Sequence, residues 1–349
     1  MEKVLNLPKF PLTGIFVDKP TDETVYDQAL LFCERCGHGQ LETVLDPKEI
    51  YNGTYSHRSS DSSISVNGNS RFAQFIKEQT ENKRFKNALD VGCSDGFLMK
   101  LLNADNVKGI DAATEGTFVE DSDLGNPDLL VSSHTFEHLE DPKAQLKRMV
   151  EAATEDTWFF ITVPCLDSMI INTRWDQVFH QHLHYFSKAS LNRMIQSAGC
   201  AVVEWGYDYE YWGGTIMVAF RKTGSTVEII PPKTASIQES IKRFFYQIAT
   251  FETNITTLYN NKELIVGFGM AQMAPILNYY CKLFEKLECV FDDKRENVYW
   301  PGKSPLCMKT PDSLDEANVV IMAPDSARPL IKRAVELKAK RILNPFQVM

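Results

Sequence analysis

The segment Asp90-Val-Gly-Cys-Ser-Asp-Gly96 combines glycines with acidic residues at the end of an apolar run. Glycines at such a point let the backbone turn tightly and let a ligand approach it closely. A helix that follows would direct its first N–H groups toward that ligand. The dinucleotide fingerprint needs a glycine at position 94, where this chain has serine. Asp90 instead suits the cationic end of a ligand, such as an amino-acid ammonium group.

A second acid, Asp111, ends the next apolar run, 19 residues after Gly92. A carboxylate at that position can accept two hydrogen bonds from a ribose diol. The two acids together predict a site for an adenosyl cofactor. We therefore expect the cofactor to be bound by Asp90, Gly92, Ser94, Asp95, Gly96, Asp111 and His134.

Three of the seven histidines lie in the segment His180-Gln181-His182-Leu183-His184. In an extended segment these three rings would point the same way. An imidazole with a near-neutral pKa is a natural base for removing a proton from a substrate. Alternating histidines can also bind metal, but no carboxylate adjoins this segment in sequence to orient them. The sequence thus predicts a base here and no metal.

Short apolar runs alternate with helical patterns from residue 85 to residue 223. A helix is predicted to begin after the cap Asp141 with Pro142 in its first turn, and another to end at Gly199. We also expect a helix over 96–102, directly after the glycine-rich turn. The order of these elements is typical of a parallel sheet that finishes in an antiparallel pair of strands.

The turn-rich segment 223–234 separates this region from a long helical pattern and a second strand–helix alternation. At roughly 100–200 residues per domain, 349 residues fit two or three domains. The predicted division is a small, loop-rich N-terminal segment over 1–84, a Rossmann-like α/β core over 85–223 and a second Rossmann-like α/β domain over 224–349.

Composition excludes several functional classes. The net charge is −9 and no run of Lys and Arg exceeds two residues, so no basic stripe for nucleic acid is visible. No stretch of 18 uninterrupted apolar residues is present, which argues against a membrane span. The eight cysteines are scattered apart from one pair, as expected for reduced thiols in a cytoplasmic protein.

The chain resembles a class I S-adenosylmethionine-dependent methyltransferase through the glycine-rich turn and Asp111. Over nearly its whole length it also resembles the sugar C-methyltransferase family, which acts on nucleotide-linked keto-deoxysugars. The motifs that carry this resemblance are Leu7–Leu12, Cys33-x-x-Cys36, His134-Thr-Phe-Glu-His138, Val163-Pro164, Phe179–Ser187, Trp212–Thr215, Gly267-Phe-Gly269 and Asp292–Gly302.

This resemblance implies an N-terminal zinc-binding piece, a central cofactor domain and a C-terminal domain that helps to hold a nucleotide-sugar. It also implies that His182 removes the proton beside a ketone, with His180 and Gln181 orienting the substrate. A ring carbon becomes nucleophilic only as an enolate, which requires such a base. The expected substrate-binding residues are Tyr55, His57, Arg58, Gly213 and Gly214.

The chain departs from the family pattern in its histidine segment and in its zinc-binding piece, among other places. The family segment reads Tyr-His-Glu-His, whereas this chain has Phe179-His180-Gln181-His182, which removes a phenol and a carboxylate. A closed zinc site needs four ligands, and only Cys33 and Cys36 of two Cys-x-x-Cys knuckles are present. Zinc binding and two free thiols therefore both stay open.

The sequence predicts an S-adenosylmethionine-dependent methyltransferase of a nucleotide-linked keto-sugar, with C-methylation favoured. The alternatives are O-methylation of a sugar or another small metabolite, and a non-catalytic subunit that binds a nucleotide-sugar. The identity of the sugar and nucleotide and the oligomeric state stay open.

Overall fold

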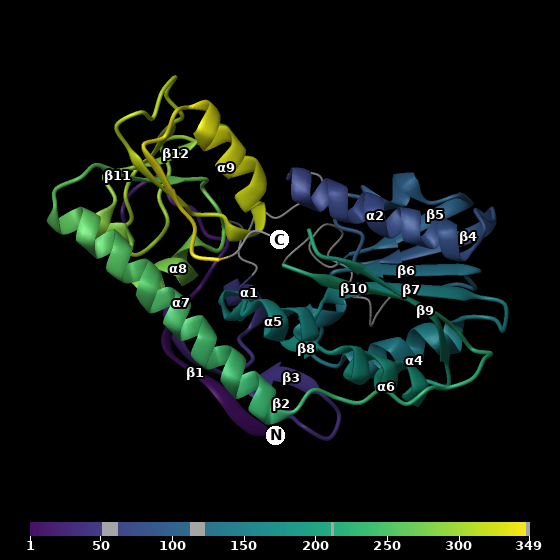
Figure 1. The fold of residues 1–349 in the computed structure, drawn as a ribbon. Helices are drawn as coiled ribbons and strands as arrows, with labels where there is room; N and C mark the ends of the chain where they lie inside the picture. Colours follow the sequence, from purple (N-terminus) through teal and green to yellow (C-terminus); the bar gives the residue numbers. More distant parts are fainter. Residues whose placement is uncertain (51–61, 112–122, 211–212, 347–349) are drawn as a thin grey trace.

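The computed structural model describes residues 1–50, 62–111, 123–210 and 213–346, which are arranged around three β-sheets (Figure 1). The central sheet has six strands. In spatial order they are β5 (Ala104–Ile110), β4 (Phe85–Val91), β6 (Leu129–Ser133), β7 (Trp158–Pro164), β10 (Thr215–Arg221) and β9 (Ala201–Asp208). The first four run parallel, and β10 is antiparallel to both β7 and β9, as the sequence predicted.

Helices cover both faces of this sheet because successive side chains of each strand point to opposite sides. On one face, Leu129 and Val131 pack with Phe72 and Phe75 of α2 (Ser63–Gln79). On the other face, Leu130 packs in the cluster that holds α4 (Pro142–Ala152) and α6 (Lys188–Ser197). Figure 1 shows α2 on one side of the sheet and α4 and α6 on the other.

The predicted helix signals act locally. The side chain of Asp141 accepts a hydrogen bond from the N–H of Ala144, with Pro142 in the first turn. Ser187 and Ser190 form a capping box at the start of α6, and Gly199 follows its end with φ +81°. Short elements complete this region: α1 (Pro47–Ile50), α5 (Leu166–Asn172) and the 3-10 helices η1 (Leu98–Leu101), η3 (Phe136–His138) and η4 (Trp175–Gln177).

The N-terminal region is a sheet, so the prediction of a loop-rich segment was wrong. Its strands are β1 (Glu2–Pro11), β2 (Val25–Cys33), β3 (His38–Leu41) and β8 (His184–Phe186), all antiparallel to their neighbours. The prolines of β1 obscured its alternation of apolar residues. They are tolerated because β1 is an edge strand, where a missing N–H breaks no ladder. Its fourth strand, β8, comes from the middle of the chain.

The C-terminal unit is a second α/β layer structure, as predicted. Its parallel sheet has the order β13 (Cys307–Lys309), β12 (Val290–Asp292), β11 (Ile265–Phe268), β14 (Asn318–Ile321) and β15 (Arg341–Leu343). Its helices are α7 (Thr234–Asn260), α8 (Ala274–Cys281) and α9 (Ala327–Glu336), with 3-10 turns η5 (Phe284–Lys286) and η6 (Pro324–Ser326).

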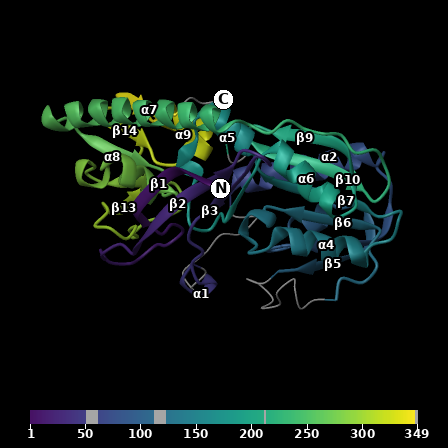
Figure 2. The ribbon, with the colours of Figure 1, turned by 90° about the horizontal axis from the view of Figure 1, so that it is seen from below.

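One apolar cluster joins the N-terminal sheet to the C-terminal unit. Leu5, Leu7 and Phe10 of β1 belong to the same buried cluster as Phe244 of α7 and Leu277 of α8. Figure 2 shows β1–β3 between the C-terminal unit and the central sheet. None of the described helices is long and apolar enough to cross a membrane.

Candidate functional site

The predicted cofactor residues meet at the carboxyl edge of the central sheet. Because β5, β4 and β6 run parallel, their carboxyl ends lie side by side, and Asp111, Gly92 and His134 follow these ends. The N–H of Ser94 donates to Oδ2 of Asp111 at 3.0 Å, which ties the glycine-rich turn to the neighbouring strand.

The glycine-rich turn is shaped by packing inside the chain. Gly92 has φ +82°, and a Cβ placed there would lie 1.8 Å from Oγ1 of Thr135. Thr135 occupies that space because its hydroxyl donates to the carbonyl of Val91. Gly96 also has a positive φ, +73°. Glycine is required at position 92 by both the backbone conformation and the neighbouring side chain.

The predicted helix over 96–102 is wrong: only the 3-10 turn η1 forms there. Residues 92–103 must both make the turn and return to the start of β5, which leaves too little chain for a full helix. The described part of this turn therefore lacks the row of helix N–H groups that was expected to face a ligand. The backbone N–H groups of the turn itself are still present. Asp95 caps that turn locally by accepting from the N–H of Phe97 at 3.3 Å.

Asp90 is a buried acid at the end of β4. It is 1% exposed, and neither carboxylate oxygen has a hydrogen-bond partner among the described residues. Burial, with the charge of Asp111 added, raises the pKa of Asp90 to about 7. An unpaired buried carboxylate is costly to the fold. A ligand that brought a cation or N–H donors to this place would relieve that cost, so the site fits S-adenosylmethionine, whose ammonium and sulfonium groups are cationic.

The segment with three histidines does not present them together, so the expectation that their rings point the same way was wrong. His180 and Gln181 form a turn that is closed by the N–H of His182 donating to the carbonyl of Phe179, and only His184 enters a strand. The Nε2 atom of His180 lies 3.1 Å from the carbonyl of Phe10, and its Nδ1 lies 3.3 Å from Nε2 of Gln28. His184 instead faces His38, with 3.0 Å between Nδ1 and Nε2. The rings thus lie in different surroundings.

The side-chain amide of Gln181 is hydrogen-bonded to the N-terminal region. Its amide oxygen accepts from the hydroxyl of Thr13 at 3.1 Å, and its amide nitrogen donates to the carbonyl of Thr13 at 3.0 Å. His180 is likewise held between β1 and β2, and burial lowers its pKa. Both residues therefore hold the N-terminal sheet against the core. Roles for them in catalysis stay predictions.

His182 instead meets two residues that the sequence analysis did not select, Glu137 and His138. The rings of His138 and His182 lie 4.8 Å apart at an interplanar angle of 73°. Nδ1 of His138 lies 2.7 Å from the carbonyl oxygen of Gln181. Since a carbonyl can only accept, Nδ1 is the donor in this contact and carries a proton. The spacing His134-x-x-Glu137-His138 at the end of a predicted strand could have indicated this pair.

Glu137 is fully buried beneath this pair. One of its oxygens lies 3.0 Å from Nδ1 of His134, and the other has no hydrogen-bond partner among the described residues. One ligand atom each from Glu137, His138 and His182 lie within 4.8 Å of one another, a donor set that could hold a metal ion. The sequence neighbours of these histidines include no carboxylate, but Glu137 reaches His182 through the fold.

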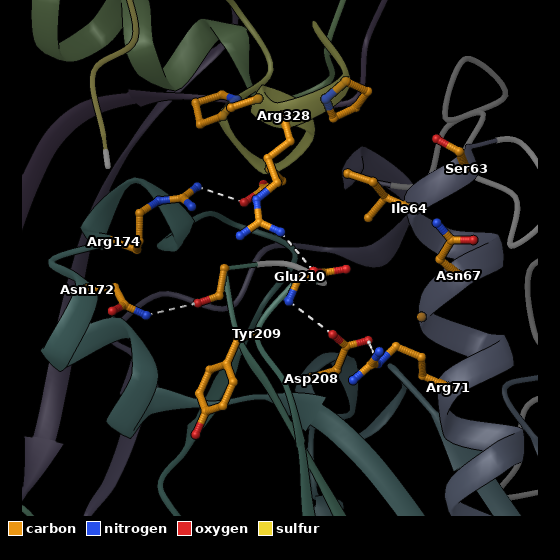
Figure 3. Close-up of a pocket in the computed structure, with 16 residues that line it drawn as sticks. Ser63, Ile64, Asn67, Arg71, Asn172, Arg174, Asp208, Tyr209, Glu210 and Arg328 are labelled. Carbon is orange, nitrogen blue, oxygen red and sulfur yellow. Dashed lines mark hydrogen bonds and ion pairs between the residues drawn. The ribbon is translucent and has the colours of Figure 1, made fainter. Parts of the chain in front are cut away.

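A cavity of about 300 Å³ lies beside this edge, between the core and the C-terminal unit (Figure 3). Residues from α2, from the turn between β9 and β10, and from η6 and α9 line it: Ser63, Ile64, Asn67, Gly68, Arg71, Asn172, Arg174, Asp208, Tyr209, Glu210, Gly213, Pro324, Asp325, Ala327, Arg328 and Pro329. Gly213 was predicted, and Gly214 adjoins it at the start of β10. Tyr55, His57 and Arg58 lie outside the described residues.

Two of the arginines in this cavity make ion pairs. Arg71 lies 3.4 Å from Asp208, and Arg328 of α9 lies 2.8 Å from Glu210. Figure 3 shows both pairs pointing into the cavity. The pair of Arg328 and Glu210 is exposed and contributes little to stability, so an anionic ligand could replace the carboxylate of Glu210 at small cost, whereas Asp208 is buried.

Arg174 is different because it is buried and joins two units of the fold. Its guanidinium binds both oxygens of Asp176 at 2.8 Å and Oδ1 of Asp325 at 2.7 Å. Burial opposes its charge, but the two carboxylates outweigh burial and raise the pKa of Arg174. The ring of Phe346 lies 4.8 Å from the guanidinium carbon. This cluster fixes η6 against the core at the wall of the cavity.

The cysteine pair lies away from this site, at the turn between β2 and β3. A structural zinc site needs four thiolate or imidazole ligands. Among the described residues no further thiol, imidazole or carboxylate joins Cys33 and Cys36 in a metal-binding group. The donor set therefore does not fit a closed zinc site within one chain.

Two family models match the chain. One, described as "Methyltransferase domain", matches residues 67–205, and the other, described as "Putative zinc binding domain", matches residues 1–51. C-methyltransferase NovU of Streptomyces niveus is 22% identical over 261 residues, which cover 68% of this chain and 62% of that protein. The alignment thus spans less than two thirds of the relative.

Solved structures show partial similarity. A S-adenosylmethionine-dependent methyltransferase of Clostridium acetobutylicum has a TM-score of 0.36 and 12% identity, covering 47% of this chain and 94% of its own. N-methyltransferase NodS of Bradyrhizobium japonicum has a TM-score of 0.35 and 14% identity, covering 46% and 97%. With the match over 67–205, the strand order of the central sheet and the site at its carboxyl edge, this chain contains an S-adenosylmethionine-dependent methyltransferase domain of the class I fold.

Proposed function

We propose that the chain transfers a methyl group from S-adenosylmethionine to a carbon of a nucleotide-linked keto-sugar. The observation that carries this proposal is the pair of imidazoles, His138 and His182, beside the cofactor edge. The partial similarity to a relative whose name is C-methyltransferase supports the choice of carbon as acceptor.

Cofactor binding rests on Asp90, Gly92 and Asp111 at the carboxyl edge. Asp90 is proposed to offer its buried carboxylate to the positive charge, and Asp111 is proposed to accept hydrogen bonds from the ribose. Ser94, Asp95 and Gly96 form the rest of the turn, and His134 flanks it from the end of β6. S-adenosylmethionine, when bound, supplies the electrophilic methyl group.

His182 is the proposed base that removes the proton next to the ketone. A carbon acid is weak, so the base must be held within reach of that proton and the negative charge on oxygen must be stabilised. His138 is the second proposed catalytic residue. Because its Nδ1–H is held by the carbonyl of Gln181, its Nε2 is directed away from that contact, and it can accept the proton or, once protonated, donate to the enolate oxygen.

The cavity between the core and the C-terminal unit is the proposed place of the nucleotide-sugar. Two features of the fold connect it to the base. The first is the segment 172–182, which runs from Asn172 in the cavity wall to His182. The second is α2, which lines the cavity and whose Asn69 accepts a hydrogen bond from the hydroxyl of Ser133 at the end of β6. Arg71 and Arg328 are the proposed partners of the diphosphate, since both side chains are more than half exposed and Arg328 can exchange its exposed partner Glu210 for phosphate.

Gly213 and Gly214 are proposed to shape the substrate side of the cavity. A Cβ at Gly213 would lie 2.6 Å from Nε2 of Gln177, and one at Gly214 would lie 2.6 Å from Cβ of Ser168. The proposed roles of Tyr55, His57 and Arg58 in holding the sugar come from the sequence alone.

The test is methyl transfer to a panel of nucleoside-diphosphate keto-deoxysugars in deuterated water. C-methylation predicts that the protein exchanges the ring hydrogen next to the ketone for deuterium, also when S-adenosylhomocysteine replaces the methyl donor. Methyl transfer to a hydroxyl without any such exchange would identify the alternative, O-methylation, for which the same imidazole pair could serve as base. Binding of both ligands without exchange or transfer would reject a catalytic role.

A further inference from the structure

The turn between β2 and β3 holds two cysteines in a tight, fixed conformation. The N–H of Cys36 bonds to the carbonyl of Cys33 at 3.3 Å, and the N–H of Gly37 bonds to the same oxygen at 2.7 Å. Gly37 has φ +75°, and a Cβ there would lie 2.6 Å from Oγ of Ser187 and 2.9 Å from Pro231. The turn is therefore held by packing as well as by its own hydrogen bonds.

The turn brings the two side chains together. A turn closed by a hydrogen bond from residue i+3 to residue i has its end Cα atoms within about 7 Å, and a disulfide needs about 4.4–6.8 Å. The thiol of Cys36 contacts the carbonyl oxygen of Cys33, with 4.0 Å between the sulfur and the oxygen. Both cysteines are partly exposed, whereas the other six are buried. They are thus the pair that a small reagent can reach.

Such a pair could instead bind a metal ion, but the described residues around it do not supply the further ligands that a metal site needs. The nearest imidazole in sequence, that of His38, is directed to His184, with 3.0 Å between its Nε2 and Nδ1 of His184. Burial, with the neighbouring His184, lowers the pKa of His38 to about 3. In the described part of the chain, only Glu137, His138 and His182 form a group that could hold a metal, and it is a different site.

We propose that Cys33 and Cys36 form a reversible intramolecular disulfide, so that this turn is a thiol–disulfide site instead of a zinc knuckle. The oxidant is a small-molecule disulfide such as oxidised glutathione. One cysteine thiolate attacks it, the S–S bond of the oxidant breaks, and one thiol leaves while a mixed disulfide forms. The second thiolate then attacks the protein sulfur of the mixed disulfide and releases the second thiol. Two protein thiols are oxidised and one disulfide is reduced to two thiols.

The site lies where the N-terminal sheet meets the start of α7. The carboxylate of Glu34, inside the turn, accepts from the hydroxyl of Thr234 at 2.9 Å, and Gly37 packs against Pro231 and Pro232. A disulfide closing so short a loop removes little conformational entropy from the unfolded chain, so the redox state itself is the readout to measure.

The experiment uses the full chain. Its zinc content is measured first, and the protein is then equilibrated with graded ratios of reduced to oxidised glutathione, quenched by alkylation and analysed by mass spectrometry. We expect less than one zinc per five chains and loss of two hydrogens confined to the peptide that holds Cys33 and Cys36, with a defined midpoint. Cys33→Ser and Cys36→Ser should each lose the intramolecular product and accumulate mixed disulfide, whereas Cys200→Ser, at a buried control position, should titrate like the wild type.

Three results would overturn the proposal. The first is one zinc per chain that is lost in Cys33→Ser. The second is a pair of thiols that stay open to alkylation at every ratio. The third is a mixed disulfide that never resolves in the wild type. Thermal melts of each variant show whether it is folded, so that a change in its redox products can be told apart from unfolding.

Discussion

His138 and His182 lie edge to face with 4.8 Å between their ring centroids, and His138 also bonds to the main chain next to His182. The contact joins η3, which follows β6, to the turn that precedes β8. The ring of His138 is held by a hydrogen bond to a main-chain carbonyl and not by the charge of His182. Their contributions to proton removal should therefore be separable by substitution.

Substitution of His182 should abolish the proposed chemistry without unfolding the chain. General acid–base catalysis contributes about 10²–10⁴-fold, so His182→Gln should lower both methyl transfer and deuterium exchange by that factor. His138→Gln should lower them as well. Turnover and exchange, measured in parallel with thermal melts, check this.

The matched control is His184→Gln, in the same segment but directed to His38. It should keep turnover within a few-fold of the wild type. Normal exchange in His182→Gln, with the variant folded, would remove this residue as the base.

Cofactor affinity should rise with pH because Asp90 is protonated near neutrality in the free protein. Burial, with the charge of Asp111, raises the pKa of Asp90 to about 7, and a bound cation favours the ionised form. Binding then releases a proton, so affinity for S-adenosylhomocysteine should increase, by up to about tenfold per pH unit, until the pH passes about 7. Calorimetric titration between pH 6 and about pH 8 measures this.

Two variants test the origin of that slope. Asp90→Asn should remove it and weaken binding at the upper pH. Asp111→Asn should weaken binding too but move the slope to lower pH, because it removes the charge that raises the pKa of Asp90. A slope that survives in Asp90→Asn would mean that another group is titrating.

The buried arginine at the cavity wall should matter for stability far more than its exposed neighbour. Arg174→Met leaves the carboxylates of Asp176 and Asp325 without their partner, and breaking a buried pair costs about 3–5 kcal/mol. Arg328→Met breaks only an exposed pair and should cost under about 1 kcal/mol. Denaturant unfolding compares the two, and equal losses would contradict the role assigned to Arg174.

Acid should destabilise the protein through the pair His38 and His184. Burial lowers the pKa of both, that of His38 to about 3, so the unfolded chain binds more protons once the pH falls below the usual value near 6.5. This stability is present above pH 6.5 and is lost progressively as the pH falls toward 3, by about 2 kcal/mol for His38 alone at pH 5. His38→Asn should show a shallower fall in melting temperature with acid than the wild type, and identical slopes would refute this.

Much of the fold could be predicted because its signals are local. Asp141 with Pro142, Ser187 and Gly199 mark helix ends through contacts with residues three or four positions away. The failures have long-range causes. The pairing of β8 with β3 depends on residues more than 140 positions apart, and the lost helix after the glycine-rich turn depends on where β5 begins.

The candidate site, like the fold, could be predicted only where its signals follow from local sequence and strand order. Asp90, Gly92 and Asp111 could be placed together because parallel strands bring their carboxyl ends to one edge. The positions of the three histidines could not be predicted, because the alternation of the segment suggests a strand. Their partners, Phe10, His138 and His38, lie on three other elements. Glu137 was missed for the same reason.

The N-terminal sheet can be completed only late in translation, because its strands come from distant parts of the chain. β3 is made long before its partner β8, and the apolar side chains of β1 wait for α7 and α8 to cover them. Leu5, Leu7 and Phe10 therefore stay exposed on the nascent chain until about residue 281 has been translated. A fragment ending at residue 223 should accordingly bind chaperones or aggregate, even though it contains every strand of the central sheet.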